Sequence, residues 1–270
     1  MRRGIALLLL IAAMTALVFA GCSATAGGGD KSWDKVKEKG EFILGLDESF
    51  PPMGFKDDNG QITGFDIDVA KEVCSRIGVK LKPQPINWDA KEQELNTGNI
   101  DCIWNGFTIT EDRKKNILFS KPYMNNRQVL VVKADSTLSK LADFEGKKIG
   151  LQAGSSAADA LAASADFKGK LKDVAEFDDN MLALMDLEKG GVDAVLMDEI
   201  VARYNIQMKG QNYKVLDEAL ASEEYGVGFR KDDTALMQKV QEALESMAKD
   251  GKLAEISTKW FGKDITTVSK

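Results

Sequence analysis

The stretch KIGLQAGSSAADALAASA occupies residues 148–165 and sets out one β-strand followed by one α-helix. Lys148 to Gln152 is a short β-type run, and the alanine-rich segment after Ser156 favours a helix. Between them, residues 153–156 supply a glycine and two serines, which favour turns and helix starts. A strand that passes through a turn into a helix is the repeating unit of α/β folds.

The same alternation of short apolar runs and amphipathic segments continues from residue 42 to residue 261. Strands are expected at 42–46, 79–86, 100–104, 127–133, 148–152, 174–177, 194–197 and 225–229. Helices are expected at 66–77, 89–96, 156–165, 180–189, from 199, at 234–249 and at 253–261. About 225 ordered residues are many for one core and comfortable for two. We therefore expect two α/β units with a ligand in the cleft between them, where small molecules prefer to bind.

The N-terminus has the layout of a signal peptide. Arg2 and Arg3 precede an apolar run at 5–19, which is shorter than the about 20 residues of a spanning helix. The run ends at Ala20-Gly21-Cys22, which resembles the bacterial lipobox, although Phe19 stands where leucine is usual. We expect removal of residues 1–21, lipidation of Cys22 with diacylglycerol and palmitate, and membrane anchoring on the extracytoplasmic face. The alternative is a plain secretory signal with an incidental cysteine.

Composition excludes several kinds of function. The chain has 36 basic and 42 acidic side chains, a net charge of −6, without a basic run, so nucleic acid is not an expected partner. It contains no histidine, which removes Ser-His and Cys-His nucleophile pairs and zinc sites that need imidazole; no metal or cofactor is expected. Cys74 and Cys102 are expected either to pair in an oxidising compartment or to be buried free thiols.

Four motifs occur in a specific order and spacing: GFDID at 64–68, TITEDRKK at 108–115, FSKPY at 119–123 and KWFG at 259–262. With these motifs the chain resembles the family-3 solute-binding proteins of ABC importers, which bind polar amino acids. The resemblance covers residues 42–262. It implies a two-lobe periplasmic-binding-protein-like fold of type II, in which each lobe is a sheet flanked by helices.

The resemblance also implies two crossing hinge strands, near residues 126–130 and 219–225, and closure of the lobes over the ligand. The expected division is a signal peptide at 1–21, an acylated tether and first helix at 22–40, lobe 1 at 41–128 and 221–263, lobe 2 at 129–220, and a tail at 264–270. The implied partners are an ABC permease with its ATPase, and the protein is expected to be a monomer.

An amino acid ligand needs a cation and amide donors for its carboxylate, and an anion for its ammonium. For the carboxylate we expect the Arg113 guanidinium, Thr108 in the turn at 105–108, and Ser155 with Ser156 at a helix start. For the ammonium, Asp198 at the end of an apolar strand and Gly106 are expected, Asp198 by the resemblance. Asp198 and the two serines could instead only cap their helices, and Thr110 is expected to cap the helix bearing Arg113.

The side chain of the ligand is expected to contact residues that follow the first apolar strands: Phe50, Trp88, Asp47, Asn105 and Trp104. Ordinary packing is the alternative for Phe50 and Trp88. Asp47, Glu48 and Asp66 give this lobe an acidic bias, although Asp66 could only cap a helix. Basic, amide-bearing and cystine-like amino acids all fit this bias, whereas Gln152 stands where some glutamine-binding relatives carry a cation.

The expected function is capture of a polar L-α-amino acid by an extracytoplasmic binding protein, without catalysis. The alternatives are an enzyme on the same scaffold, of the cyclohexadienyl dehydratase or murein lyase type, and a sensory ligand-binding protein. An enzyme would need a protonatable group over its substrate. Arg113 and Asp198 instead look like a clamp for a zwitterion, which favours retention over turnover.

Overall fold

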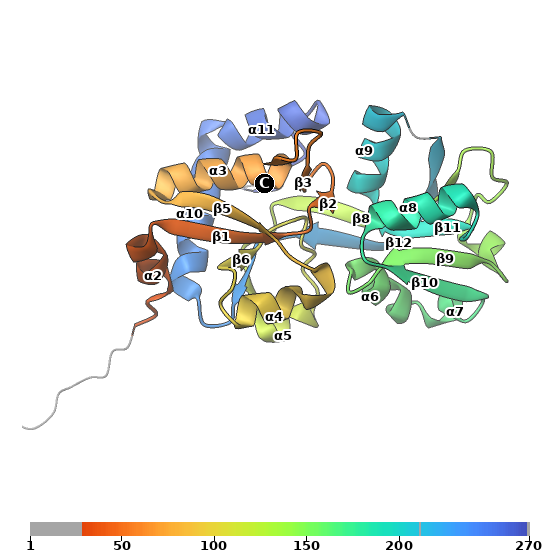
Figure 1. Cartoon of the computed structure of the whole chain (residues 1–270), viewed down its shortest axis with the longest axis horizontal. Coiled ribbons are helices and arrows are strands. Elements are labelled where there is room, and N and C mark those ends of the chain that lie inside the picture. The colour runs from red at the N-terminus through yellow and green to blue at the C-terminus, as the bar shows by residue number, and fades with distance from the viewer. Residues whose placement is uncertain (1–28, 211, 269–270) are drawn as a thin grey trace, which may run out of the picture.

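The computed structural model describes residues 29–210 and 212–268. The expected signal peptide and Cys22 lie outside the described residues. The molecule consists of two lobes set side by side, each a sheet with helices on both faces (Figure 1). This is the two-lobed α/β fold expected from the sequence.

Lobe 1 holds a five-stranded sheet in the order β5-β1-β6-β13-β7 and a small sheet in the order β2-β3-β4. Its strands are β1 (Glu41–Leu46), β2 (Ser49–Phe50), β3 (Gly54–Lys56), β4 (Ile62–Thr63), β5 (Lys80–Pro85), β6 (Cys102–Ile103), β7 (Ile117–Phe119) and β13 (Gly228–Arg230). Its helices are α2 (Ser32–Lys39), α3 (Phe65–Ile77), η1 (Trp88–Ala90), α4 (Lys91–Asn96), α5 (Arg113–Asn116), α10 (Thr234–Asp250) and α11 (Lys252–Phe261). Lobe 1 is thus built from both ends of the described chain (Figure 1).

Lobe 2 holds the second five-stranded sheet, in the order β10-β9-β11-β8-β12. Its strands are β8 (Met124–Lys133), β9 (Lys148–Gln152), β10 (Asp173–Phe177), β11 (Ala194–Asp198) and β12 (Tyr213–Tyr225). Its helices are η2 (Leu141–Phe144), α6 (Ser156–Ala163), α7 (Ala165–Lys168), α8 (Asn180–Lys189) and α9 (Glu199–Lys209).

The long strands β8 and β12 connect the lobes (Figure 1). They pair antiparallel from Met124 opposite Tyr225 to Lys133 opposite Tyr213. The register shifts between Val215 and Ala219 and again between Ala219 and Ala221. The crossing strands were expected in this part of the chain, while the residue numbers at which one lobe gives way to the other stay a prediction.

The apolar periodicity of the sequence matches the burial that the structure shows. In β8, Leu130 and Val132 enter one hydrophobic cluster and Val129 and Val131 another, as alternation along a strand requires. In α10, the apolar residues Leu236, Val240, Leu244 and Met247 recur at helical spacing and are buried. Burial of the apolar side chains on both faces of the strands and on one face of each helix supplies most of the free energy that stabilises each lobe.

Some expected boundaries were wrong. The strand expected at 225–229 is divided, because Tyr225 still pairs in β12 and β13 begins at Gly228. The strand expected at 100–104 contains only Cys102 and Ile103. The segment at 89–96 begins with a 3-10 turn, η1, before α4 starts at Lys91.

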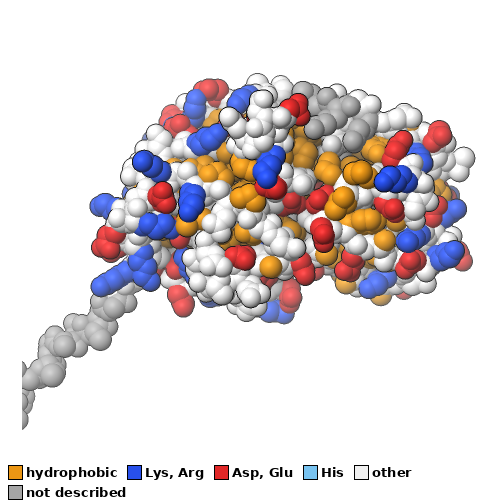
Figure 2. Space-filling view, in the orientation of Figure 1, with side chains coloured by type: hydrophobic (Ala, Val, Ile, Leu, Met, Phe, Trp, Pro, Cys, Tyr) orange, Lys and Arg blue, Asp and Glu red, His pale blue; other side chains and the backbone are white. Residues whose placement is uncertain are grey.

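Cys74 and Cys102 are both buried free thiols, as one of the two expected alternatives stated. Burial raises the pKa of Cys74 to about 12, so its thiol is unreactive. None of the helices within residues 29–210 and 212–268 is long and apolar enough to cross a membrane. Acidic and basic side chains are interspersed over the face of both lobes shown in Figure 2.

Candidate ligand-binding site

The candidate site lies where the strands of the two sheets end. In lobe 1, β1, β5 and β6 run parallel, and the chain leaving them carries Phe50, Trp88 and Thr108. In lobe 2, the parallel strands β9 and β11 end at Gln152 and Asp198. Ligands of α/β proteins collect at such carboxyl ends, because the loops there are free of the packing of the sheet.

Residues from both lobes line one narrow space between them, with a cavity volume of about 10 Å³. It is lined by Phe50, Trp88, Gly106, Thr108, Arg113, Gln152, Ser155, Ser156 and Asp198. Eight of these nine were expected site residues, and the structure brings them together from five separate segments. Asp47, Asn105 and Trp104 do not line this space. Gln152 does, although the sequence had not marked it as a contact.

Arg113 is a buried cation at one end of the space. Its Nη1 donates to the Thr108 carbonyl oxygen (2.9 Å), and its guanidinium lies 4.7 Å from the centre of the Phe107 ring. Its one ion-pair partner among the described residues, Asp159 at 3.5 Å, has a side chain that is 58% exposed. Burial lowers the pKa of Arg113, yet an arginine keeps its proton in proteins. The site therefore holds a positive charge that is only weakly compensated.

The local fold around Arg113 differs slightly from expectation. Helix α5 begins at Arg113 with Asp112 at the N-cap position, and the Asp112 side chain makes no capping bond. The Thr110 hydroxyl nevertheless accepts a hydrogen bond from the Arg113 backbone N–H (3.1 Å), which is the bond expected of Thr110. This bond fixes the turn from which the guanidinium enters the site.

Asp198 is a buried carboxylate from lobe 2. It occupies the N-cap position of α9, but its side chain makes no capping bond. Its Oδ1 instead accepts from Asn126 Nδ2 and from the Tyr225 hydroxyl, both at 2.6 Å. Burial, together with the nearby Glu223 carboxylate, raises the pKa of Asp198 to about 7. The Asp198 side chain therefore does not cap α9 through a hydrogen bond. Its carboxylate is instead bound by one residue from each of the two hinge strands.

Gly106 has φ +57° in a turn that a buried carboxylate holds in place. The Gly106 N–H donates to Asp66 Oδ2 (2.7 Å), and the Tyr123 hydroxyl donates to the same oxygen (3.0 Å). Burial raises the pKa of Asp66 to about 7. Asp66 therefore fixes the Gly106 turn by accepting its N–H. It does not cap α3, because the N-cap of that helix has no side-chain hydrogen bond.

Asp47 and Gln152 form a polar bridge between the lobes beside the enclosed space. Gln152 Nε2 donates to Asp47 Oδ2 (2.8 Å), and Asn180 Nδ2 donates to Gln152 Oε1 (3.1 Å). The other Asp47 oxygen accepts from the Ser49 N–H (2.8 Å). Burial raises the pKa of Asp47 to about 6. Asp47 is therefore occupied by protein partners, and Gln152 is the residue that faces the space.

Aromatic side chains form part of the wall of the site. Trp88 meets Phe107 edge to face, with ring centres 5.9 Å apart. Phe50 lies in the short strand β2 and is 6% exposed. Trp104 is fully buried in lobe 1 and packs against Tyr123 at 6.4 Å between ring centres. Phe50 and Trp88 can thus cover the apolar part of a ligand, while Trp104 does not line the space.

The lobes contact each other through the Gly154 carbonyl. This oxygen accepts from Lys91 Nζ of lobe 1 (2.8 Å) and from Arg113 Nη2 (3.3 Å). Lys91 is 4% exposed, and its burial, with the positive charge of Arg113, lowers its pKa to about 8. Sequence reasoning missed Lys91, because a lysine in a polar helix ordinarily faces solvent.

Gly154→Ala is expected to raise the Kd for the ligand about tenfold while leaving each lobe folded. Gly154 has φ +63°, and a Cβ there would lie 2.7 Å from Asp89 Oδ1 and 3.1 Å from Asp89 Cα, across the gap between lobes. The methyl group therefore opposes full closure and weakens two charged hydrogen bonds, each about 1.5–3 kcal/mol. Isothermal titration calorimetry measures the change.

Gly190→Ala is the matched control for Gly154→Ala. Gly190 has φ +80° at the end of α8, and no atom would lie within 4 Å of its new Cβ. Both variants carry the same kind of backbone cost, about 1 kcal/mol, and should lose a similar few degrees of Tm. Equal Kd values for the two variants would show that Gly154 does not control closure.

The fold and the site define a class of protein: two α/β lobes joined by paired strands, with a buried arginine of one lobe and a buried aspartate of the other lining the space between them. The chain belongs to the bacterial extracellular solute-binding proteins, family 3, whose model matches residues 42–263. This confirms the family expected from the four sequence motifs.

Similar proteins carry names that state a ligand. The L-cystine-binding protein TcyJ of Escherichia coli strain K12 is 34% identical over 95% of this chain and 96% of its own length. The L-arginine-binding protein of Pseudomonas aeruginosa is 30% identical, over 82% and 88%. A substrate-binding protein of an ABC uptake transporter from Streptococcus pneumoniae, solved with bound histidine, is 40% identical with a TM-score of 0.86, over 88% and 99%.

The names of these relatives describe binding proteins for amino acids, and the chain is accordingly a solute-binding protein. Membership of an extracellular solute-binding family also places it outside the cytoplasm.

Proposed function

We propose that this protein captures an L-α-amino acid between its lobes and delivers it to an ABC permease and its ATPase. The observation that carries the proposal is the pair of opposite charges, Arg113 from lobe 1 and Asp198 from lobe 2, which line one enclosed space. A zwitterion with one carboxylate and one ammonium complements both. Because each charge belongs to a different lobe, the ligand stabilises the closed form.

The side-chain preference that fits the site is cationic or cystine-like. Phe50 and Trp88 offer flat apolar faces, and aromatic faces attract a nearby cation. Gln152 adds an amide, and Asp47 adds negative charge behind it. The relatives named for cystine, arginine and histidine agree with this class of ligand.

A thermal unfolding screen tests the proposed function. The protein is partly unfolded in guanidinium, dialysed to remove bound ligand, refolded, and melted with each of the common L-amino acids and L-cystine. A ligand at 100 times its Kd adds about 2.7 kcal/mol, which corresponds to a Tm rise of about 5 to 10 °C for a chain of this size. D-enantiomers serve as controls. A refolded protein that no L-amino acid stabilises would refute the proposal.

The location on the membrane is part of the same proposal. We propose that Cys22 carries the lipid that tethers the protein to the extracytoplasmic face, and that the protein acts as a monomer. The sequence around Cys22 supports the anchor. The mass of the mature N-terminal peptide, compared with that of Cys22→Ser, measures the lipid directly.

A further inference from the structure

Glu223, a residue that the sequence did not single out, lies where both lobes and the hinge meet. It stands in β12 opposite Asn126 of β8. Its Oε2 accepts from Thr108 Oγ1 of lobe 1 (3.1 Å) and lies 3.4 Å from Ser156 Oγ of lobe 2. The same oxygen accepts from Asn126 Nδ2 (3.1 Å) and Gln128 Nε2 (3.0 Å). One carboxylate oxygen therefore gathers four polar groups.

These contacts fix the direction in which two hydroxyls point. A hydroxyl has one proton to donate. Thr108 donates its proton to Glu223, and Ser156 lies 3.0 Å from Thr108 Oγ1, so its proton goes either to that oxygen or to Glu223. Ser156 Oγ in turn accepts from Gln128 Nε2 (3.1 Å). Neither hydroxyl keeps a proton for a ligand carboxylate, and both present lone pairs.

The surroundings of this hydroxyl pair are rich in acceptors. Asp198 shares the Asn126 amide with Glu223, so two carboxylates lie close together. Among the described residues, Asn126 Oδ1 and Gln128 Oε1 are buried acceptors without a donor. An ammonium brings three donors and no acceptor, whereas a carboxylate brings only acceptors. This end of the space is therefore suited to an ammonium.

We propose that Glu223 is a positioning residue that turns the Thr108 and Ser156 hydroxyls into acceptors for the α-ammonium of the ligand. The inference rests on the proposed function. It moves both hydroxyls from the carboxylate end, where the sequence analysis placed them, to the ammonium end beside Asp198. The carboxylate is then left to Arg113 and to the backbone N–H groups at the start of α6. Glu223 thereby makes the site selective for ligands with a free α-ammonium.

The test compares three probes on Glu223→Gln. The probes are L-arginine, its analogue without the ammonium (5-guanidinopentanoate) and its analogue without the carboxylate (agmatine); L-cystine, 3,3′-dithiodipropionate and cystamine are the corresponding set if the protein binds cystine. We expect Glu223→Gln to raise the Kd of the parent amino acid about tenfold or more, because a neutral amide no longer orients the hydroxyls. The analogue without the ammonium should bind as well as before, or more tightly.

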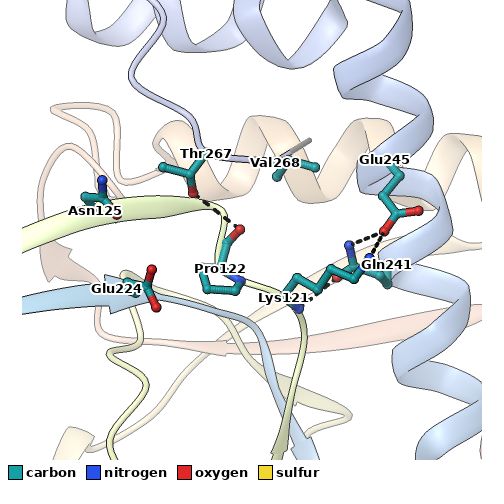
Figure 3. A pocket seen from close by; sticks show the side chains of 8 residues that line it. All are labelled: Lys121, Pro122, Asn125, Glu224, Gln241, Glu245, Thr267 and Val268. Atoms are coloured by element: carbon teal, nitrogen blue, oxygen red, sulfur yellow. Dashed lines mark hydrogen bonds and ion pairs between the residues drawn. The ribbon is translucent and has the colours of Figure 1, made fainter. Parts of the chain in front are cut away.

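Glu224→Gln is the matched control. Glu224 is the next residue of β12, is exposed, and lines a separate hollow together with Lys121 and Gln241 (Figure 3). Its replacement changes the charge of the same strand and should leave all three Kd values unchanged. Glu223→Asp, which keeps the carboxylate, should preserve the preference for ligands with an ammonium.

Thr108→Val separates hydroxyl orientation from the charge of Glu223. It removes the acceptor without changing any charge, and it should weaken the parent amino acid and agmatine but not the analogue without the ammonium. Parallel weakening of all probes by Glu223→Gln, or no weakening, would overturn the inference while the proposed function stands. A wild-type protein that binds no amino acid would overturn the proposed function, and this inference with it.

Discussion

Replacing Arg113 with methionine is expected to raise the Kd of the amino acid at least about 100-fold. The guanidinium is buried, lies over Phe107, and has only the exposed Asp159 as its ion-pair partner among the described residues. A ligand carboxylate would supply the missing negative charge through a planar, two-bond contact. Truncating one partner of such a buried charge pair costs about 2–5 kcal/mol, and every 1.4 kcal/mol is a factor of ten in Kd.

Stability in the absence of ligand should respond very differently. Burying the guanidinium costs desolvation, so methionine at position 113 should change the ligand-free Tm by only a few degrees. Arg113→Lys keeps the charge but not the planar fork and should bind with intermediate affinity. Lys114→Met is the matched control, because Lys114 follows Arg113 in α5 and pairs at the surface with Glu111 (2.7 Å). Near-normal binding by a folded Arg113→Met would remove the basis of the proposed function.

In the proposed function, the position of each charge in the fold couples binding to closure. Arg113 is the first residue of a short helix in lobe 1. Asp198 ends a strand of lobe 2 and accepts hydrogen bonds from Asn126 and Tyr225 of the hinge strands. Opening of the lobes would separate the two charges, so a ligand could then contact only one of them. The direct contacts from Lys91 and Arg113 to Gly154 add a closing force that does not depend on the ligand. In the proposed function, affinity therefore also depends on Lys91 and Gly154, which do not line the space.

Local patterns were enough to predict most of the helices and strands. The strand at 148–152 and the helix at 180–189 have the expected boundaries, because an apolar run before a glycine turn and an aspartate cap before a 3.6-residue repeat are local signals. The short strands β6 and β13 were misjudged, since their lengths depend on pairing with strands distant in sequence. The residues near β6 and β13 in the sequence give no signal of which distant strands they pair with.

The residues that line the space or lie beside it were expected where a sequence motif contained them, and were missed where only the three-dimensional arrangement brings them there. Arg113 and Asp198 were expected from their surroundings in sequence. Glu223 was not, because its position depends on the register of β12 against β8, which shifts twice between Val215 and Ala221. Lys91 was missed for a related reason, since only the contact between lobes buries it. Trp104 lies between β6 and the turn at 105–108, yet its side chain is buried in the core of lobe 1.

Asp198→Asn is expected to raise the Kd by a factor of about 30 or more and to reduce the pH dependence of binding. Burial and Glu223 raise the pKa of Asp198 to about 7, so in the ligand-free protein its carboxyl gains a proton as the pH falls below 7. An ammonium ligand needs the ionised form. Binding must then expel the proton, and the Kd should rise up to about tenfold per pH unit below 7. The affinity is thus fully present above pH 7 and lost on acidification.

The same shift has the opposite consequence for the ligand-free fold. Because the folded pKa of Asp198 lies above its ordinary value of 3.8, the folded state binds more protons between about pH 4 and 7, and this residue's contribution to stability falls as the pH rises through that window. Asp47 and Asp66, with pKa values raised to about 6 and about 7 by burial, titrate in the same range. Calorimetric Kd values from about pH 5.5 to 7.5 for wild type and Asp198→Asn therefore have to be compared, with L-histidine avoided because its imidazole titrates there. A pH dependence of equal slope in both proteins would assign it to Asp47 or Asp66 and would remove Asp198 from the ammonium site.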